Sequence, residues 1–179
     1  WNGCVMGSDK LGAFMLCYLD KFGERYLSQE YVGWLNDSEL MKYSEQRHYS
    51  HTVASCSEYV DSFKGSENLL YAVIDIKSKR HVGNINAYID RFNQTADVGI
   101  LIAVGGCGYG ISAWNQMLDR LFSPAFNIRK VNAGAMSENS GMIGIFEKSG
   151  MSHEYTKVRH FCFEQRLCDM KVYYKERPL

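Results

Sequence analysis

Several features that define other classes of protein are missing from this sequence. It has only two prolines in 179 residues and no Pro-rich or Ser-rich segment that would mark a linker. Its 20 Lys and Arg are balanced by 20 Asp and Glu, so no charge excess favours nucleic acid or a membrane surface as a partner. No apolar run approaches the roughly 20 residues that span a bilayer.

The six cysteines form no C-x-x-C pair, which argues against zinc sites and against a dense disulfide framework. We therefore predict no metal site. The N-terminal segment lacks the basic and apolar regions of a signal peptide, so we expect reduced thiols and a cytoplasmic location. With 46% hydrophobic residues, we expect one domain over 1–179, in which residues 1–12 are poorly ordered or foreign to the fold.

What the sequence does contain is a glycine-rich run, Gly105-Gly106-Cys107-Gly108-Tyr109-Gly110. The apolar run before it, 98–104, is typical of a buried strand, and apolar residues recur at helical spacing in 111–122. Glycines at such a junction let backbone amides approach a ligand, and the helix N-terminus adds partial positive charge. The run predicts a cradle for phosphate, with an ordinary turn as the alternative.

The remaining pattern predicts a mixed order of strands and helices. We expect strands at 13–19, 69–76, 81–89, 96–104, 130–136, 155–163 and 168–174, and helices at 30–36, 52–65, 111–122 and 139–148. A hairpin followed by alternating strands and helices predicts a three-layer α/β domain with a mixed sheet.

Three segments, in this order, carry a resemblance to a known family. They are Tyr31-Val32-Gly33-Trp34-Leu35-Asn36-Asp37, the loop Gly106–Ala113, which fits G-x-G-Y-G-x-x-A, and Asn139 followed by Phe146-Glu147-Lys148-Ser149-Gly150-Met151. Together they resemble the GCN5-related N-acetyltransferase (GNAT) superfamily, and within it the branch of ribosomal-protein and sugar-amine N-acetyltransferases. The resemblance implies an α/β/α domain with a mostly antiparallel sheet and a splayed parallel strand pair at the cofactor site.

The resemblance also implies acetyl coenzyme A as the acyl donor. Backbone groups of Ile102 and Val104 are expected to bind the pantetheine arm, and an amide near Ala103 or Val104 to polarise the thioester carbonyl. Asn139 would position the pantetheine, Phe146 would pack on the cofactor and Lys148 would reach its phosphates. The residues expected at the pyrophosphate are Gly106, Cys107, Gly108, Tyr109, Gly110, Ile111 and Ser112.

Two positions depart from the family pattern. Gly105 occupies a loop position that usually holds Gln or Arg. Phe146 stands where many members carry a Tyr that protonates the departing thiolate, and a phenyl ring cannot donate a proton. Any acid used here is therefore expected to be another group or water.

On the acceptor side we expect a small molecule with a primary amine, for which we favour an amino sugar. A base must remove a proton from this amine. Asp97 is the first candidate, because this branch often has a Glu there, and His51 is the second, because histidine titrates near neutral pH. The expected substrate contacts are Tyr31, Trp34, Arg47 and Tyr88, with Arg47 suited to a phosphate or carboxylate.

Structural roles are the alternative for most of these residues. Tyr31 and Trp34 would also suit core packing, Asp97 a strand end, His51 a helix start and Lys148 a solvent-facing position. Three other functions stay open: a non-catalytic acyl-CoA-binding module, acetylation of a protein N-terminus or antibiotic amine, and a nucleotide-binding module of another class. The aromatic residues of the last two strands could pair in a homodimer or fill a core.

Overall fold

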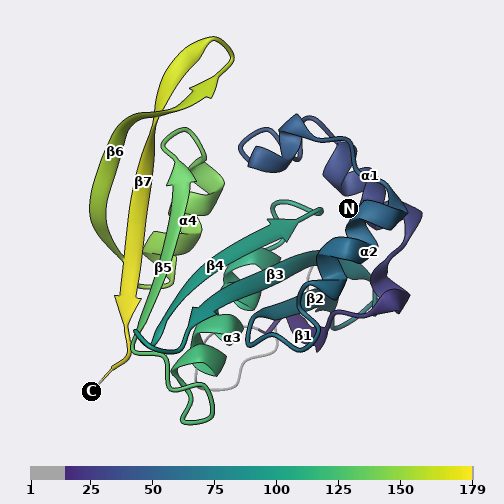
Figure 1. The fold of residues 1–179 in the computed structure, drawn as a ribbon, viewed down its shortest axis with the longest axis horizontal. Coiled ribbons are helices and arrows are strands. Elements are labelled where there is room, and N and C mark those ends of the chain that lie inside the picture. Colours follow the sequence, from purple (N-terminus) through teal and green to yellow (C-terminus); the bar gives the residue numbers. More distant parts are fainter. Residues whose placement is uncertain (1–14, 179) are drawn as a thin grey trace.

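A seven-stranded sheet, in the order β1-β2-β3-β4-β5-β7-β6, forms the centre of the computed structural model, which describes residues 15–178 (Figure 1). The expectation for residues 1–12 lies outside this range. The strands are β1 (Cys17–Lys21), β2 (Leu69–Asp75), β3 (His81–Asp90), β4 (Thr95–Ile102), β5 (Lys130–Met136), β6 (Ser152–Phe163) and β7 (Arg166–Glu176). The helices are α1 (Gln29–Asn36), α2 (Val53–Asp61), α3 (Tyr109–Phe122) and α4 (Ser140–Lys148), with short 3-10 helices η1 (Glu24–Tyr26) and η2 (Glu45–His48).

Strands β4 and β5 are the one parallel pair in the described sheet, and the other neighbouring strands are antiparallel. Their pairing covers only Thr95–Asp97 against Lys130–Asn132. Beyond these residues the two strands diverge (Figure 1). The predicted mixed, mostly antiparallel sheet with a splayed parallel pair is confirmed.

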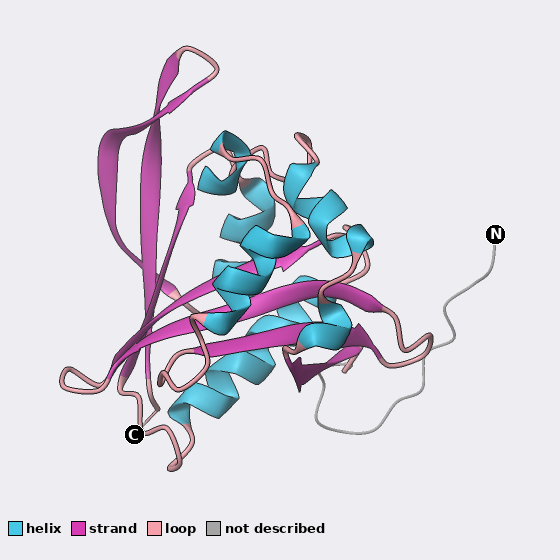
Figure 2. Ribbon diagram, turned by 45° about the vertical axis from the view of Figure 1, so that its right-hand side comes forward, coloured by secondary structure: helices cyan, strands magenta, loops and turns pink. Residues whose placement is uncertain are grey.

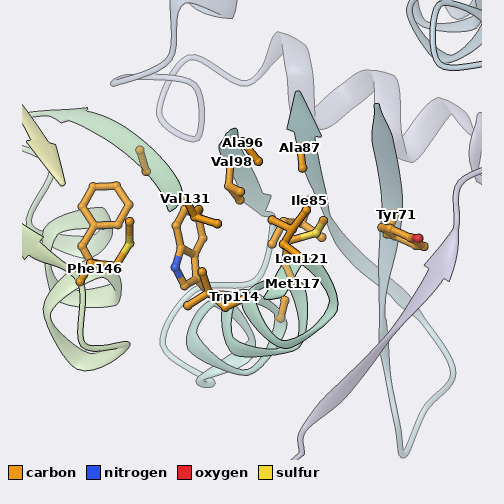
Figure 3. Close-up of a cluster of buried hydrophobic side chains, with 14 of the residues drawn as sticks. Tyr71, Ile85, Ala87, Ala96, Val98, Trp114, Met117, Leu121, Val131 and Phe146 are labelled. Atoms are coloured by element: carbon orange, nitrogen blue, oxygen red, sulfur yellow. The ribbon is translucent and has the colours of Figure 1, made fainter. Parts of the chain in front are cut away.

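Helices cover both faces of the sheet (Figure 2). On one face α3 and α4 bury the larger core, in which Trp114 lies next to Val131 and Phe146 (Figure 3). On the other face α1 and α2 pack Tyr31 and Cys56 against β2. The α/β/α layering predicted from the sequence is therefore confirmed. No helix in the described part of the chain is long and apolar enough to cross a membrane.

Local signals set the helix starts. The Thr52 side chain caps α2 and forms a reciprocal capping box with Ser55. Asn139 caps α4, as the sequence indicated. Helix α3 begins at Tyr109, two residues earlier than expected, because Gly108 takes a left-handed conformation and ends the loop there.

The last two strands are longer than the sequence pattern suggested and form a hairpin that projects beyond the sheet (Figure 1). Its tip returns to the segment between α1 and α2, where the Phe163 ring lies 5.6 Å from the Tyr43 ring. Phe163 and Tyr173 are buried within this one chain. These two aromatic side chains therefore fill the core of the chain, which was one of the two alternatives.

Candidate active site

The glycine loop leads into the start of α3, where backbone amides have no partner within the helix. Gly106 and Gly108 have φ angles of 79° and 80°, which a residue with a side chain rarely adopts. No side chain caps α3, and its first intrahelical bond runs from the Ser112 amide to the Gly108 carbonyl. The amides of the first turn therefore point out of the helix, where an anion can bind.

Two of the glycines also make room for close packing around this helix start. A Cβ at Gly110 would lie 2.7 Å from Ile145 Cδ1 of α4, and one at Gly108 would lie 3.0 Å from Leu16 Cδ1. Ser112 is buried, and its Oγ accepts a hydrogen bond from the Leu16 amide at 3.3 Å. The loop is thus held against α4 and the start of β1, while Gly106 and Cys107 stay exposed.

The hydrogen bonds between β3 and β4 determine which backbone groups of β4 face the gap where β4 and β5 diverge, which we call the splay. The Ala103 amide donates to the Val82 carbonyl of the neighbouring segment at 2.9 Å. Because bonding direction alternates along an antiparallel pair, the backbone groups of Ile100 and Ile102 point the other way, toward β5. The amide of Ala103 is therefore not available to a thioester carbonyl, and this part of our expectation is corrected. Ile100 was missed, although strand alternation could have identified it.

A cavity of about 770 Å³ opens where β4 and β5 diverge. Its walls near the splay are residues 98–101 of β4, 134–136 of β5, and Asn139 and Met142 at the start of α4. Asn139 Oδ1 accepts a hydrogen bond from the Met142 amide at 3.1 Å, so the cap of α4 fixes this side chain at the cavity. The glycine loop follows directly from this wall of β4.

The other end of the cavity lies between the α1–α2 segment, β3 and the β6–β7 hairpin. It is lined by Tyr31, Leu35, Leu40, Met41, Tyr43, Ser44, Glu45, Gln46, Tyr49, Ser50, His51, Ser55, Cys56, Tyr59, Leu70, Asn84, Asn86, Tyr88 and Phe161. One space therefore joins the strand splay to a surface rich in tyrosine.

Three of the residues predicted for the acceptor side line this cavity. Tyr31 is buried, and burial raises the pKa of its hydroxyl. The Tyr88 hydroxyl lies 3.3 Å from the Tyr59 hydroxyl. His51 Nε2 lies 3.3 Å from the Gln46 carbonyl oxygen. These three residues therefore lie at the cavity, and their roles toward an acceptor stay predictions.

Trp34, Arg47 and Lys148 are among the predicted residues that lie outside the lining. The Trp34 ring packs 4.8 Å from the His81 ring, within a cluster of aromatic side chains. Arg47 donates from one guanidinium nitrogen to Glu45 Oε1 at 2.9 Å and to the Ser44 carbonyl at 2.8 Å. Lys148 is exposed in the last turn of α4, at the opposite end from Asn139.

Asp97 is the last residue of β4 that pairs with β5. It lies directly opposite Tyr88 in the β3–β4 register, so the two side chains share a face of the sheet. Asp97 is an exposed residue, and partial burial of its carboxyl raises its pKa. Asp97 therefore lies beside the cavity rather than in its lining.

Phe146 lies in the core and not at the cavity. Its ring is completely buried, 5.4 Å from the Trp114 ring and 5.1 Å from the Tyr173 ring. The enclosed ring offers no surface to a cofactor, so we leave Phe146 out of the contacts proposed below.

We expect Phe146→Tyr to lower stability without raising activity. The new hydroxyl would be buried among apolar rings, and an unpaired buried hydroxyl costs about 1–3 kcal/mol. Chemical denaturation should show this loss, while kcat should not increase. A tenfold rise in kcat would contradict the buried position of this ring.

The residues that sequence reasoning missed come mainly from long-range contacts. Asn84 reaches the cavity because residues 84, 86 and 88 alternate onto one face of β3. That alternation was the available signal. Tyr43 and Phe161 reach it because the β6–β7 hairpin folds back onto the α1–α2 segment, for which the local sequence gives no signal.

Comparison with known proteins identifies the family of this chain. A family model described as an acetyltransferase (GNAT) domain matches residues 22–152. No match was found among curated proteins. A solved structure of spermidine N-acetyltransferase from Vibrio cholerae, in complex with CoA and spermine, is similar with a TM-score of 0.81 and 21% identity, covering 90% of this chain and 96% of that chain.

Two further solved structures have the same fold. An acetyltransferase of the GNAT family from Bacillus anthracis has a TM-score of 0.75 and 22% identity, covering 89% of this chain and 93% of that chain. RimL, a ribosomal L7/L12 α-N-protein acetyltransferase in complex with coenzyme A, has a TM-score of 0.78 and 12% identity, covering 88% and 92%. Because the family model covers most of the sequence, the chain belongs to the GNAT acetyltransferases, which are enzymes that use acetyl-CoA as their acyl donor.

Proposed function

We propose that the protein transfers an acetyl group from acetyl-CoA to the primary amine of a small acceptor, by direct attack in a ternary complex. An amino sugar is the acceptor class that we favour. The observation that carries this proposal is the continuous cavity between the β4/β5 splay and the tyrosine-rich surface of the α1–α2 segment. It provides one place for a donor and an acceptor to meet.

The donor side fits coenzyme A by its chemistry. The outward amides at the start of α3 suit a pyrophosphate, and the inward-facing backbone groups of Ile100 and Ile102 suit the amides of a pantetheine arm. When bound, acetyl-CoA supplies a thioester carbonyl that an uncharged amine can attack, with coenzyme A leaving as the thiolate. An amide of Ile100 or Ile102 replaces Ala103 as the proposed donor to the carbonyl oxygen. Asn139 would orient the arm from the start of α4.

Asp97 remains our proposed base for the acceptor amine, acting through Tyr88 or a water molecule because it lies beside the lining. We expect Asp97→Asn to lower kcat about 100-fold, the usual scale of a lost general base. The affinity for coenzyme A should stay within about twofold, since no loop amide is changed. An unchanged kcat would rule out Asp97 and leave His51 as the next candidate.

The raised pKa of Asp97 gives this assignment a pH signature. A base must be ionised, so kcat/KM should fall as the pH drops through the Asp97 pKa, and this fall should be absent in Asp97→Asn. Stability should change in the opposite sense. The folded state holds the Asp97 proton more tightly than the unfolded chain, so the free energy of unfolding should decrease as the pH rises through that pKa.

The proposed function is tested by turnover. Release of coenzyme A should be measured with acetyl-CoA and a panel of amines that includes amino sugars, an aminoglycoside and a short peptide with a free N-terminus. We expect turnover with an amino sugar. Tight binding of coenzyme A with no turnover on any amine would instead indicate a non-catalytic acyl-CoA-binding module.

Homodimer formation and a cytoplasmic location stay predictions. Strand β6 ends the sheet, and most of its residues are exposed. Such an edge leaves backbone groups that a second copy could pair with. The oligomeric state in solution would test this directly.

A further inference from the structure

We propose that the acceptor end of the cavity selects an amine whose remaining groups are uncharged hydroxyls, and disfavours acceptors that carry a phosphate or several cationic amines. This inference rests on the proposed amine acetylation and specifies its acceptor. It replaces the sequence-based idea of an acceptor phosphate or carboxylate held by Arg47.

The charged side chains of the cavity are few. Among the described residues that line it, Glu45 is the one carboxylate and His51 is the one group that can become cationic, and no Lys or Arg contributes. Glu45 is already paired with Arg47 at 2.9 Å and lies 3.9 Å from His48 Nε2. The lining is therefore close to neutral.

Two cations that neighbour lining residues in the chain, Arg47 and Lys42, contact the hairpin. Arg47 Cζ lies 5.8 Å from the centroid of the Phe163 ring, and Lys42 Nζ lies 6.0 Å from it. Both therefore pack on the hairpin tip. Without them, a phosphate in the cavity would lose its hydration and find no Lys or Arg side chain as a partner, which is unfavourable. Within the lining, a polyamine would meet one carboxylate, which Arg47 already pairs with, and Asp97 beside the lining is the one further carboxylate that the proposed reaction uses.

Neutral polar groups, by contrast, are abundant at this end. The lining residues that carry them are Tyr31, Tyr43, Tyr49, Tyr59, Tyr88, Ser44 and Ser50, with hydroxyls, and Gln46, Asn84 and Asn86, with amides. Hydroxyls and amides both donate and accept, so they match the hydroxyls of a polyhydroxylated acceptor. Aromatic rings add apolar surface for its C–H faces.

The fold holds the Asn84 amide in a defined orientation. Asn84 is only 7% exposed, and its Oδ1 accepts a hydrogen bond from His81 Nε2 at 2.8 Å. The His81 ring is fixed in turn by Trp34 at 4.8 Å and Tyr26 at 4.9 Å, and burial lowers its pKa, which favours the neutral ring. With Oδ1 occupied, Nδ2 is the group that Asn84 can offer to an acceptor oxygen. Trp34 therefore influences the site through two intermediate side chains.

A glycine makes room for the second amide. A Cβ at Gly99 would lie 2.9 Å from Asn86 Oδ1, so the Asn86 side chain occupies the space above Gly99 on β4. Both residues line the cavity. The β3 wall of the cavity therefore presents two neutral amides. A site for an anionic acceptor would be expected to present a cationic side chain instead.

The test compares three acceptors: glucosamine, glucosamine 6-phosphate and spermidine. We expect kcat/KM for glucosamine to exceed that for each of the others by at least about tenfold, because one unpaired buried charge costs more than 1.4 kcal/mol. Equal or better turnover of the phosphate or of spermidine would overturn the inference. In Gln46→Lys the ratio of kcat/KM for glucosamine to kcat/KM for glucosamine 6-phosphate should decrease. The uncharged Gln46→Met should keep the wild-type order of kcat/KM among the three acceptors.

Calorimetry on the coenzyme A complex separates this inference from the proposed function. If glucosamine binds more tightly than glucosamine 6-phosphate and spermidine but is not acetylated, the proposed function fails and the preference against additional charges holds. If the phosphate or spermidine binds more tightly, the inference fails whatever the turnover. Failure of all three to bind also overturns it.

Discussion

Gly108→Val is expected to raise the Kd for coenzyme A at least about tenfold. Gly108 has a φ angle of 80°, and a β-branched residue held there costs about 1–3 kcal/mol. Its new side chain would also press on Leu16 Cδ1, which lies 3.0 Å from the position of a Cβ. If the loop relaxes to relieve the strain, the amides at the start of α3 move, and the proposed pyrophosphate contacts are lost. Calorimetric titration with coenzyme A measures the effect.

The same loop provides a matched control. A Cβ at Gly105 would have no neighbour within 4 Å, and the φ angle of Gly105 is not in the left-handed region. Gly105→Ala should therefore bind coenzyme A within about twofold of the wild type, since ordinary surface changes have small effects. Equal weakening by the two substitutions would show that any added side chain disturbs the loop. Unchanged binding in Gly108→Val would contradict the role given to this helix start.

Trp114→Ala is expected to lower the free energy of unfolding by about 3–5 kcal/mol, the usual cost of deleting a buried large aromatic side chain. Trp114 is completely buried and packs on Phe146 of α4. It therefore connects α3, which follows the glycine loop, to α4, which Asn139 caps (Figure 3). The measurement is chemical denaturation, with binding of coenzyme A measured in parallel.

Trp114→Phe separates packing from hydrogen bonding. The indole Nε1 has no hydrogen-bond partner among the described residues. Phenylalanine therefore keeps an aromatic ring in place and removes no hydrogen bond, so the loss should be about 1–2 kcal/mol. A loss as large as that of the alanine variant would mean that the indole nitrogen makes an essential interaction.

Local patterns in the sequence predicted the main helices and strands and the glycine loop before α3. The glycines before α3, the Asn139 cap and the apolar strand at 98–102 each act through nearby backbone geometry. Such features depend on neighbouring residues, so they can be recognised without knowing the fold. Asp97 was suggested by the resemblance, and the structure makes it the last residue of β4 that pairs with β5.

The acceptor side was less accessible to sequence reasoning. Trp34 and Arg47 lie in a motif that suggested substrate contact, yet Trp34 packs on His81 and Arg47 binds Glu45. A helical pattern shows which residues share a face, but it does not show whether that face meets a core or a cavity. Phe146 illustrates the same limit, because its burial depends on Trp114 and Tyr173 from two other elements.

By itself, the sequence determined a layered α/β domain and the glycine loop at the start of α3, because these follow from hydrophobic spacing, capping and backbone freedom. Its three motif segments indicated the family by resemblance. Only the tertiary structure decided which β4 amides face β5, which side chains line the cavity and how nearly neutral that lining is. Those properties arise where β3, the α1–α2 segment and the β6–β7 hairpin meet. The residues concerned are far apart in the chain, and only folding brings them together.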